Sequence, residues 1–376
     1  MSGIYIHIPF CLSKCIYCNF YSSTDLKLKE NFLNALIQEM QQRKDYLPNS
    51  PVKTLYFGGG TPSLLSIDEL QTILDTLRSC FNLTALREMT IEINPDNIGT
   101  KYFSELKSNG FNRLSIGIQS FDDAILRLLR RRHSAKEAIH TLHNAFNAGF
   151  SNISIDLIYG ITERSNSRWI NELKQSFSFP ITHLSAYALT VEENTLLYKK
   201  IKQGDMTSYS ENQSITDFYS LIKMAEENDF IQYEISNFAK DNHISLHNFS
   251  YWQSVPYLGL GPSAHSFNGN SRQWNVANIV KYIKGIQQQK AVYEIEKLTD
   301  KDLFNEYILL HLRSYQGIDL DFVKNHYGEK QQLYLIEAFK NIKKSYYIRQ
   351  NNSFMLTNAG KLFADHIASE LFLSNP

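Results

Sequence analysis

The sequence predicts an α/β protein with two parts: an open, partial (β/α)6 barrel of the TIM type, and a smaller, mainly helical, winged-helix-like domain. Two observations predict this fold class. Short apolar segments alternate with amphipathic helical patterns roughly six times, which is too few units to close an eight-fold barrel. After residue 298 helical patterns and a hairpin signal replace this alternation. We therefore expect domains at 1–235 and 299–376, with 236–298 connecting them.

The barrel is expected to begin with the apolar run 4–10, followed by a cysteine-containing loop and a helix over 26–46. A capping box of Ser66 with Glu69 marks the start of the next helix. The other expected strands are 54–57, 89–93, 113–118, 153–158 and 183–189. The helices expected between and after them are 101–108, 122–129, 135–148, 167–177 and 209–228.

The pattern changes beyond Phe230. Segment 233–239 is expected to be a strand that leaves the barrel, and it is followed by the polar-aromatic segment 247–252 and the glycine-rich segment 259–266. From Thr299 onward nine basic residues face nine acidic ones, which argues against DNA binding by the last domain. Its expected helices are 302–315, 319–327, 330–345 and 359–372, with a hairpin turn at 351–353.

The overall charge excludes some classes of partner. Lys and Arg number 38, as do Asp and Glu, so we expect no nucleic-acid partner and no membrane-surface role. We also expect no membrane span, because no apolar stretch reaches the roughly 18 residues that a bilayer requires. No signal peptide precedes the first predicted strand, and we expect a cytoplasmic protein in which thiols stay reduced.

Three of the four cysteines lie close together, as Cys11-x-x-x-Cys15-x-x-Cys18. Thiolates at this spacing can converge on one metal centre, and three of them on an iron-sulfur cluster leave one iron without a protein ligand. Zinc is the alternative, for which His7 is the nearest fourth ligand. A disulfide framework is the weaker interpretation because three thiols cannot all pair, and Cys80 is typical of an ordinary buried cysteine.

Three further features have both a structural and a functional interpretation. The turn 58–62, Gly-Gly-Gly-Thr-Pro, could be a tight connection, but three glycines more often indicate close backbone approach by a ligand. Glu92 could be a solvated carboxylate at a strand end or part of a site. Arg130 and Arg132 are typical of a solvated helix end.

The cysteine spacing, with the aromatic residue Tyr17 before the last cysteine, resembles the radical S-adenosylmethionine (SAM) superfamily. The resemblance implies a [4Fe-4S] cluster held by Cys11, Cys15 and Cys18. It also implies that the open iron binds the amino and carboxylate groups of SAM. One electron from the cluster then cleaves SAM to a 5'-deoxyadenosyl radical.

Within this superfamily the chain is similar to the oxygen-independent coproporphyrinogen oxidase family, from Gly3 to about Leu373. Further matches lie in motifs at 117–121, 129–133 and 156–160. Where the family usually continues the last motif with Leu-Pro, this chain has Ile161-Thr162. The resemblance implies that the turn at 58–62 pairs its backbone with the amino group of SAM. The SAM contacts that it implies are Tyr5, Tyr17, Gly59, Gly60, Thr61, Glu92, Gln119, Arg131 and Asp156.

The segment His247-Asn248-x-x-Tyr251-Trp252 resembles a motif of the heme chaperone branch of this family. That resemblance implies a protein that binds heme and delivers it to heme-requiring proteins, including respiratory-chain components. A histidine beside aromatic residues suits a flat ligand with a central iron, although a lone histidine is more often structural. We therefore expect His247 to be an axial heme ligand. The competing candidates are His7, His265 and Cys80.

Two other functions compete with the heme chaperone. One is oxygen-independent coproporphyrinogen III oxidase, which decarboxylates porphyrinogen propionates. Members of that branch carry an N-terminal extension and a further cysteine two residues after the cluster motif, where this chain has Asn19-Phe20, so this activity is not expected. The other is a purely structural iron-sulfur adaptor, which would leave the SAM-site residues unexplained.

Overall fold

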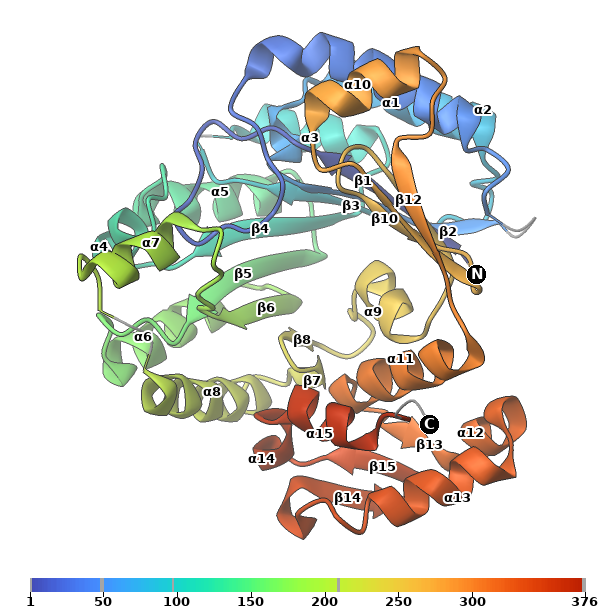
Figure 1. Cartoon of the computed structure of the whole chain (residues 1–376). Coiled ribbons are helices and arrows are strands. Elements are labelled where there is room, and N and C mark those ends of the chain that lie inside the picture. Colours follow the sequence, from blue (N-terminus) through green and yellow to red (C-terminus); the bar gives the residue numbers. More distant parts are fainter. Residues whose placement is uncertain (1, 48–50, 97, 208–209, 374–376) are drawn as a thin grey trace.

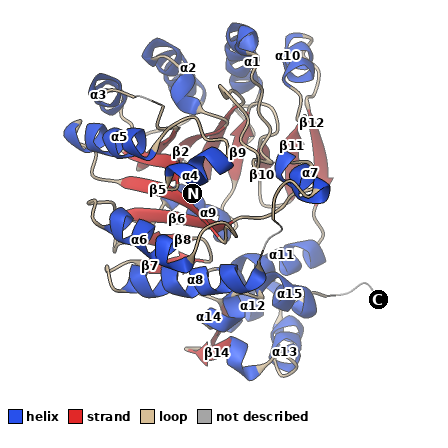
Figure 2. Cartoon of the chain, turned by 90° about the vertical axis from the view of Figure 1, so that its left-hand side faces the viewer, coloured by secondary structure: helices blue, strands red, loops and turns tan. Residues whose placement is uncertain are grey.

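The computed structural model describes residues 2–47, 51–96, 98–207 and 210–373. A twelve-stranded sheet in the order β12-β11-β10-β9-β1-β2-β3-β4-β5-β6-β8-β7 forms the main body. Figure 1 shows it as a curved wall, and Figure 2 shows helices along its outer side. The strands are Ser2–Ile8, Val52–Gly59, Glu88–Ile93, Arg113–Gln119, Ile153–Tyr159, His183–Ala188, Ile231–Glu234, Asn237–Ala239, Tyr257–Leu260, His265–Phe267, Ser271–Asn275 and Tyr293–Lys297 for β1 to β12.

The six strands β1 to β6 pair in parallel, each joined to the next by helices, so the predicted open (β/α)6 barrel is confirmed. Capping boxes at Ser66 and Ser134 start α2 and α5. The ten helices of this body in the described ranges are Lys29–Gln42, Ile67–Cys80, Thr100–Ser108, Asp123–Leu128, Ala135–Asn147, Asn166–Phe177, Leu196–Gln203, Glu211–Glu226, Leu246–Trp252 and Ile279–Gln287, numbered α1 to α10.

Alternation along the strands separates the outer core from a polar interior. In β1, Ile4, Ile6 and Ile8 are fully buried and belong to the hydrophobic core beneath the outer helices. Tyr5 and His7 point to the opposite face, because successive side chains of a strand alternate. The inner face of the barrel is therefore lined by polar and aromatic side chains.

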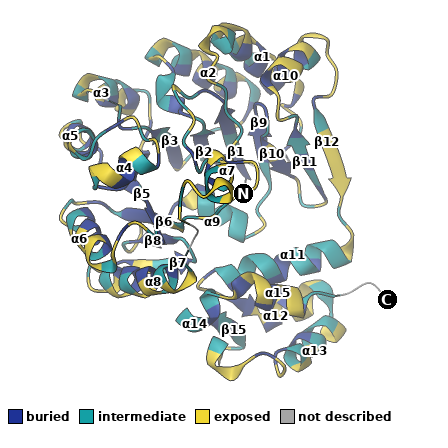
Figure 3. Cartoon of the chain, turned by 60° about the vertical axis from the view of Figure 1, so that its left-hand side comes forward, coloured by how far each residue is buried: buried dark blue, intermediate teal, exposed yellow. Residues whose placement is uncertain are grey.

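Segment 236–298 does more than connect two domains, in contrast to the prediction. It supplies β8 to β12 to the main sheet, and β9 pairs in parallel with the free edge of β1. Its apolar residues, among them Leu258 and Tyr282, are part of the main core. Figure 3 shows that β12, at the end of this extension, is the exposed edge of the sheet.

The last domain has its own core, which runs from Phe304 to Leu371. A three-stranded sheet in the order β13-β15-β14 packs with five helices in the described range. The predicted hairpin turn is present, with Asn351 and Asn352 at positive φ of 46° and 62°, as a type I′ turn requires. The elements are α11 Asp300–Arg313, β13 Ile318–Asp319, α12 Leu320–Tyr327, α13 Glu329–Ala338, β14 Tyr347–Gln350, β15 Ser353–Leu356, α14 Asn358–Lys361 and α15 Ala364–Leu371.

Some boundaries differ from those expected. The helix predicted over 209–228 is α8, Glu211–Glu226, and residue 209 lies outside the described residues. The eight-residue helix α7 was not predicted. Within the described ranges, no helix is long and apolar enough to span a bilayer.

Candidate functional site

The cysteine loop follows β1 and is fixed at both its base and its tip. At the base, the Cys11 N–H donates to the Ser23 carbonyl over 3.0 Å. At the tip, Ile16 is buried and its N–H donates to the Leu129 carbonyl after α4. The carbonyl of Ile16 accepts from the Leu197 N–H at the start of α7 over 2.9 Å. The unpredicted helix α7 therefore supports the cysteine loop.

A cavity of about 570 Å³ opens beside this loop at the carboxyl ends of the barrel strands. The three cysteine residues Cys11, Cys15 and Cys18 line it. Tyr5 does not reach its wall, since its hydroxyl bonds to His7 Nδ1 over 3.1 Å and its ring stacks on Tyr56. The other expected SAM residues all line the cavity: Tyr17, Gly59, Gly60, Thr61, Glu92, Gln119, Arg131 and Asp156.

The glycine turn allows close approach by the chain's own backbone. A Cβ on Gly60 would lie 2.5 Å from the Phe10 carbonyl oxygen and 2.8 Å from that of Ile8. Gly59 has a φ of +107°, and a Cβ there would meet the His7 ring at 2.5 Å. The next residue, Thr61, donates its hydroxyl to Cys11 Sγ over 3.6 Å. The turn thus holds the start of the cysteine loop as well as lining the cavity.

Arg131 lies between the cysteine loop and two neighbouring strand ends. Its Nη1 donates to Cys15 Sγ over 3.5 Å, and its Nη2 donates to the Gly117 carbonyl over 2.8 Å and to Asn94 Oδ1. Its Nε is buried and has no hydrogen-bond partner among the described residues, so one donor is available to a bound group. The flanking Arg132 is half-exposed and lies 4.0 Å from Asp96.

Glu92 and Asp156 place two carboxylates on one cavity wall. Glu92 accepts hydrogen bonds from the Tyr56 hydroxyl at 3.0 Å and the Gly59 N–H at 3.1 Å. Burial, with the nearby charge of Asp156, raises the pKa of Glu92 to about 7. Burial raises the pKa of Asp156 to about 6, although the Ser115 hydroxyl donates to it over 3.1 Å. A cationic ligand in the cavity would favour the ionised form of both groups.

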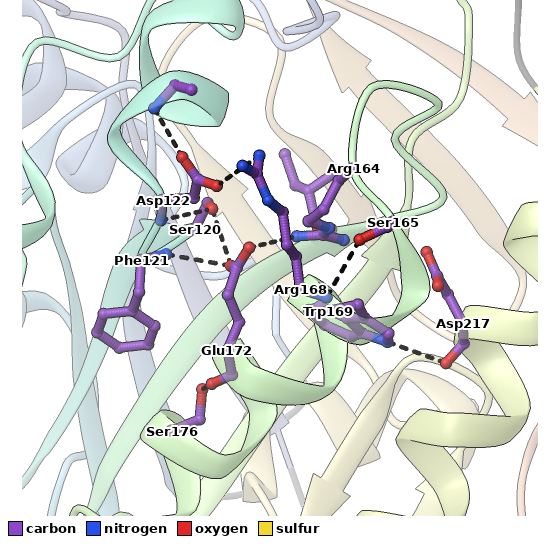
Figure 4. A network of polar contacts seen from close by, with 12 residues as sticks. Ser120, Phe121, Asp122, Arg164, Ser165, Arg168, Trp169, Glu172, Ser176 and Asp217 are labelled. Atoms are coloured by element: carbon purple, nitrogen blue, oxygen red, sulfur yellow. Dashed lines mark hydrogen bonds and ion pairs between the residues drawn. The ribbon is translucent and has the colours of Figure 1, made fainter.

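Gln119 ends β4 in a left-handed conformation, with φ of 68°. The turn after it is held by Glu172 of α6, which accepts from the Ser120 hydroxyl at 2.8 Å and the Phe121 N–H at 3.1 Å (Figure 4). The fully buried Arg164 pairs with Glu172 over 3.0 Å. A buried ion pair thus fixes the backbone that presents Gln119.

The departure from the family motif at 161–162 has a structural consequence. Ile161 is fully buried and packs with Leu129 and Ile158 in a small apolar cluster. Tyr17 of the cysteine loop packs against the same cluster. The isoleucine therefore helps to support the ring that precedes Cys18.

The thiols suit a cluster better than a single ion. No three His, Cys, Asp or Glu side chains in the described ranges meet closely enough to bind one ion, whereas a multi-iron cluster holds its cysteines at separate corners. His7, the nearest candidate for a fourth ligand in the zinc alternative, has both ring nitrogens occupied, by the Tyr5 hydroxyl at Nδ1 and by the Tyr21 carbonyl 2.9 Å from Nε2. Burial raises the pKa of the Cys11 and Cys18 thiols, so metal binding would have to displace their protons.

His247 lies on α9, which sits inside the curve of the sheet (Figure 1), and its neighbour Asn248 lines the cavity. Its Nδ1 is 2.8 Å from Thr54 Oγ1 and its Nε2 is 2.8 Å from the Tyr251 hydroxyl. Only 1% of the residue is exposed, and burial lowers its pKa to about 3. The imidazole is thus neutral, but neither nitrogen is free for iron in this conformation.

The cavity is also lined by residues that the sequence did not single out as candidates, among them Tyr56 and Asn248. Tyr56 precedes the glycine turn and supports Glu92, and its place in a strand directly before that turn was the available signal. Asn248 comes from α9, next to His247, and nothing local placed it near the cysteines. A separate cavity of about 730 Å³ lies between α1 and α10, and no predicted site residue lines it.

An open (β/α)6 barrel with three cysteines on the loop after its first strand defines a radical SAM protein, and residues 5–174 match the model of the Radical SAM superfamily. The chain is 32% identical over 372 residues to the heme chaperone HemW of Bacillus subtilis (strain 168), covering 98% of each chain. It is 31% identical over 375 residues to the heme chaperone HemW of Mycobacterium tuberculosis (strain CDC 1551 / Oshkosh), covering 98% of this chain and 94% of that one. The chain belongs to the HemW family.

The fold is also that of a solved structure, coproporphyrinogen III oxidase (HemN) from Escherichia coli, a radical SAM enzyme. The TM-score is 0.86 at 23% sequence identity, over 99% of this chain and 90% of that one. Membership of the radical SAM superfamily implies a [4Fe-4S] cluster and SAM as cofactors. The cysteine-lined cavity, the buried unpaired Nε of Arg131 and the two carboxylates fit such a pair of ligands.

Proposed function

We propose that this protein is a heme chaperone with a radical SAM core, which binds heme and delivers it to heme-requiring proteins, including those of respiratory chains. The observation that carries the proposal is the match to HemW relatives along almost the entire chain. That match includes the last domain and α9, and is not limited to the part shared by all radical SAM proteins.

We further propose that Cys11, Cys15 and Cys18 hold the cluster, and that the cavity residues bind SAM. Glu92 and Asp156 would face the positively charged groups of SAM, while Arg131 would face its carboxylate or ribose. When bound, the cluster and SAM supply one-electron chemistry. This chain's residues orient SAM and exclude water around it.

The cysteine assignment is tested by substitution. Serine at Cys11, Cys15 or Cys18 should abolish the iron content and brown colour of anaerobically reconstituted protein. Cys80→Ser is the matched control, because this residue ends α2 and packs against the main core. An intact cluster in the Cys15→Ser protein would contradict the assignment.

The alternative function is oxygen-independent coproporphyrinogen III oxidase, whose fold the chain shares. The deciding experiment incubates reconstituted protein anaerobically with SAM, a reductant and coproporphyrinogen III, and analyses the products. A heme chaperone should leave the tetrapyrrole unchanged and should transfer bound heme to an apo-hemoprotein. Decarboxylated product would support the oxidase, and a failure to bind heme would overturn the chaperone proposal.

A further inference from the structure

Four side chains compete to be the heme ligand, and contacts exclude two of them in the described conformation. His247 is buried, with Thr54 and Tyr251 on its two ring nitrogens. His7 is buried as well, with a hydroxyl and a carbonyl on its nitrogens. An iron atom could reach either imidazole only after buried hydrogen bonds had broken, and a buried polar group left unpaired is costly.

The third candidate, Cys80, lies on the outer side of the sheet. It is the last residue of α2, and its side chain packs against the main hydrophobic core. Its sulfur also lies 3.7 Å from the Ser79 hydroxyl. The thiol is therefore partly buried against the core on the outer side of the sheet.

His265 differs from these three candidates in both exposure and contacts. It is the first residue of β10 and is exposed. Its side chain makes no hydrogen bond or ion pair with any residue of 2–47, 51–96, 98–207 or 210–373, so a ring nitrogen is open to iron. Burial of part of the ring, with Arg272 nearby, lowers the pKa of His265, which keeps the imidazole neutral at neutral pH.

An aromatic side chain lies directly beside His265. Trp274 of β11 is its partner in the antiparallel register, and the two ring centroids are 6.3 Å apart. Side chains opposite one another in a sheet share a face, so the indole is placed to pack against a planar ligand bound to the imidazole. The backbone is fixed here, because the Asn275 N–H donates to the Ala264 carbonyl over 2.9 Å.

The pair lies on the same face of the sheet as the SAM cavity. Tyr5 pairs in register with Gly259, and Tyr257 pairs with Phe267, so the alternation of side chains places His265 on the face that carries Tyr5. In the sheet order β11-β10-β9-β1, one strand separates His265 from β1 and two strands separate Trp274 from it. No residue of 257–275 lines the SAM cavity, so both sites can be filled together.

We infer that His265 is the axial ligand of heme iron and that Trp274 packs against the porphyrin, on the inner face of the β9–β11 extension. This inference rests on the proposed heme chaperone function. It assigns heme to the sheet surface at His265 and Trp274, and leaves His247 as a structural residue that holds α9 in the barrel.

The test is a titration of the full chain with ferric heme, followed by absorbance and electron paramagnetic resonance. His265→Ala should shift the Soret band and weaken binding at least tenfold. Trp274→Ala should weaken binding while keeping the wild-type resonance signature, since the iron ligand remains. His247→Ala should keep the wild-type Soret position, and His140→Ala, an exposed histidine on the outer helix α5, is the matched control.

The outcomes distinguish a failure of the ligand assignment from a failure of the proposed chaperone function. A His265→Ala protein that folds, as judged by circular dichroism, and keeps both the Soret position and the affinity of the wild type would overturn the ligand assignment alone. If His247→Ala loses the wild-type spectrum while His265→Ala keeps it, the ligand is His247 on α9, and the assignment of His265 is overturned. Absence of heme binding by the wild type would overturn the chaperone function itself. A His265→Met protein with a changed ligand-field spectrum would support direct coordination.

Discussion

The imidazole of His247 stacks on the phenol ring of Tyr56, with the ring centroids 5.1 Å apart and the planes 25° from parallel. The Tyr56 hydroxyl donates to Glu92 Oε1 in the SAM cavity. A single side chain therefore connects α9 with the carboxylate that we expect to face SAM.

Removal of the Tyr56 hydroxyl should weaken SAM binding. In Tyr56→Phe the stack on His247 remains, but Glu92 loses a hydrogen bond, and bonds to charged groups contribute about 1.5–3 kcal/mol. We expect the dissociation constant for SAM to rise roughly tenfold or more, measured by calorimetry on reconstituted protein. Tyr102→Phe is the control, since that hydroxyl bonds to the Leu65 carbonyl away from the cavity.

A methyl group on Gly60 should damage the cluster. Its Cβ would lie 2.5 Å from the Phe10 carbonyl oxygen, directly before Cys11, so the cysteine loop would have to move. We expect Gly60→Ala to lower the iron content after reconstitution. Gly99→Ala is the matched control because a Cβ there meets no atom within 4 Å. Equal iron content in the two variants would contradict this role of the turn.

Loss of the buried ion pair of Arg164 with Glu172 should destabilise the barrel (Figure 4). In Glu172→Leu the Arg164 guanidinium would stay buried without its counter-charge, which costs about 3–5 kcal/mol. We expect a clear drop in the urea midpoint, followed by circular dichroism. Glu227→Ala breaks an exposed pair with Lys223 on α8 and should change the free energy of unfolding by less than about 1 kcal/mol.

The local motifs were predictable from the sequence because their chemistry and their spacing lie within a few residues. The cysteine loop, the glycine turn and the six strand-helix units belong to this group, as does the I′ turn at Asn351-Asn352. The reason for glycine at position 60 was not predictable, because the atoms that exclude a Cβ belong to β1 and the loop after it, about 50 residues away.

The position of α9 could not be predicted for a similar reason. The helix has only seven residues, too few for a periodic pattern. It is held by Glu88, whose carboxylate accepts from the N–H groups of Leu246 and His247 at 2.7 and 2.9 Å across more than 150 residues of chain. The strands β9 to β12 were missed because each has five residues or fewer.

The two carboxylates of the cavity predict a pH dependence of SAM affinity. Without ligand, the pKa of Glu92 is raised to about 7 and that of Asp156 to about 6, so Glu92 is largely protonated at pH 6. SAM carries positive charge and favours the ionised carboxylates, so binding at low pH must first release a proton. Affinity should therefore rise with pH, by about tenfold between pH 6 and pH 8 for one released proton. Calorimetry in buffers that differ in ionisation enthalpy measures the number of protons released when SAM binds. Glu92→Gln should bind SAM more weakly at pH 8 and lose most of the dependence, and an unchanged pH profile in that variant would show that another group titrates.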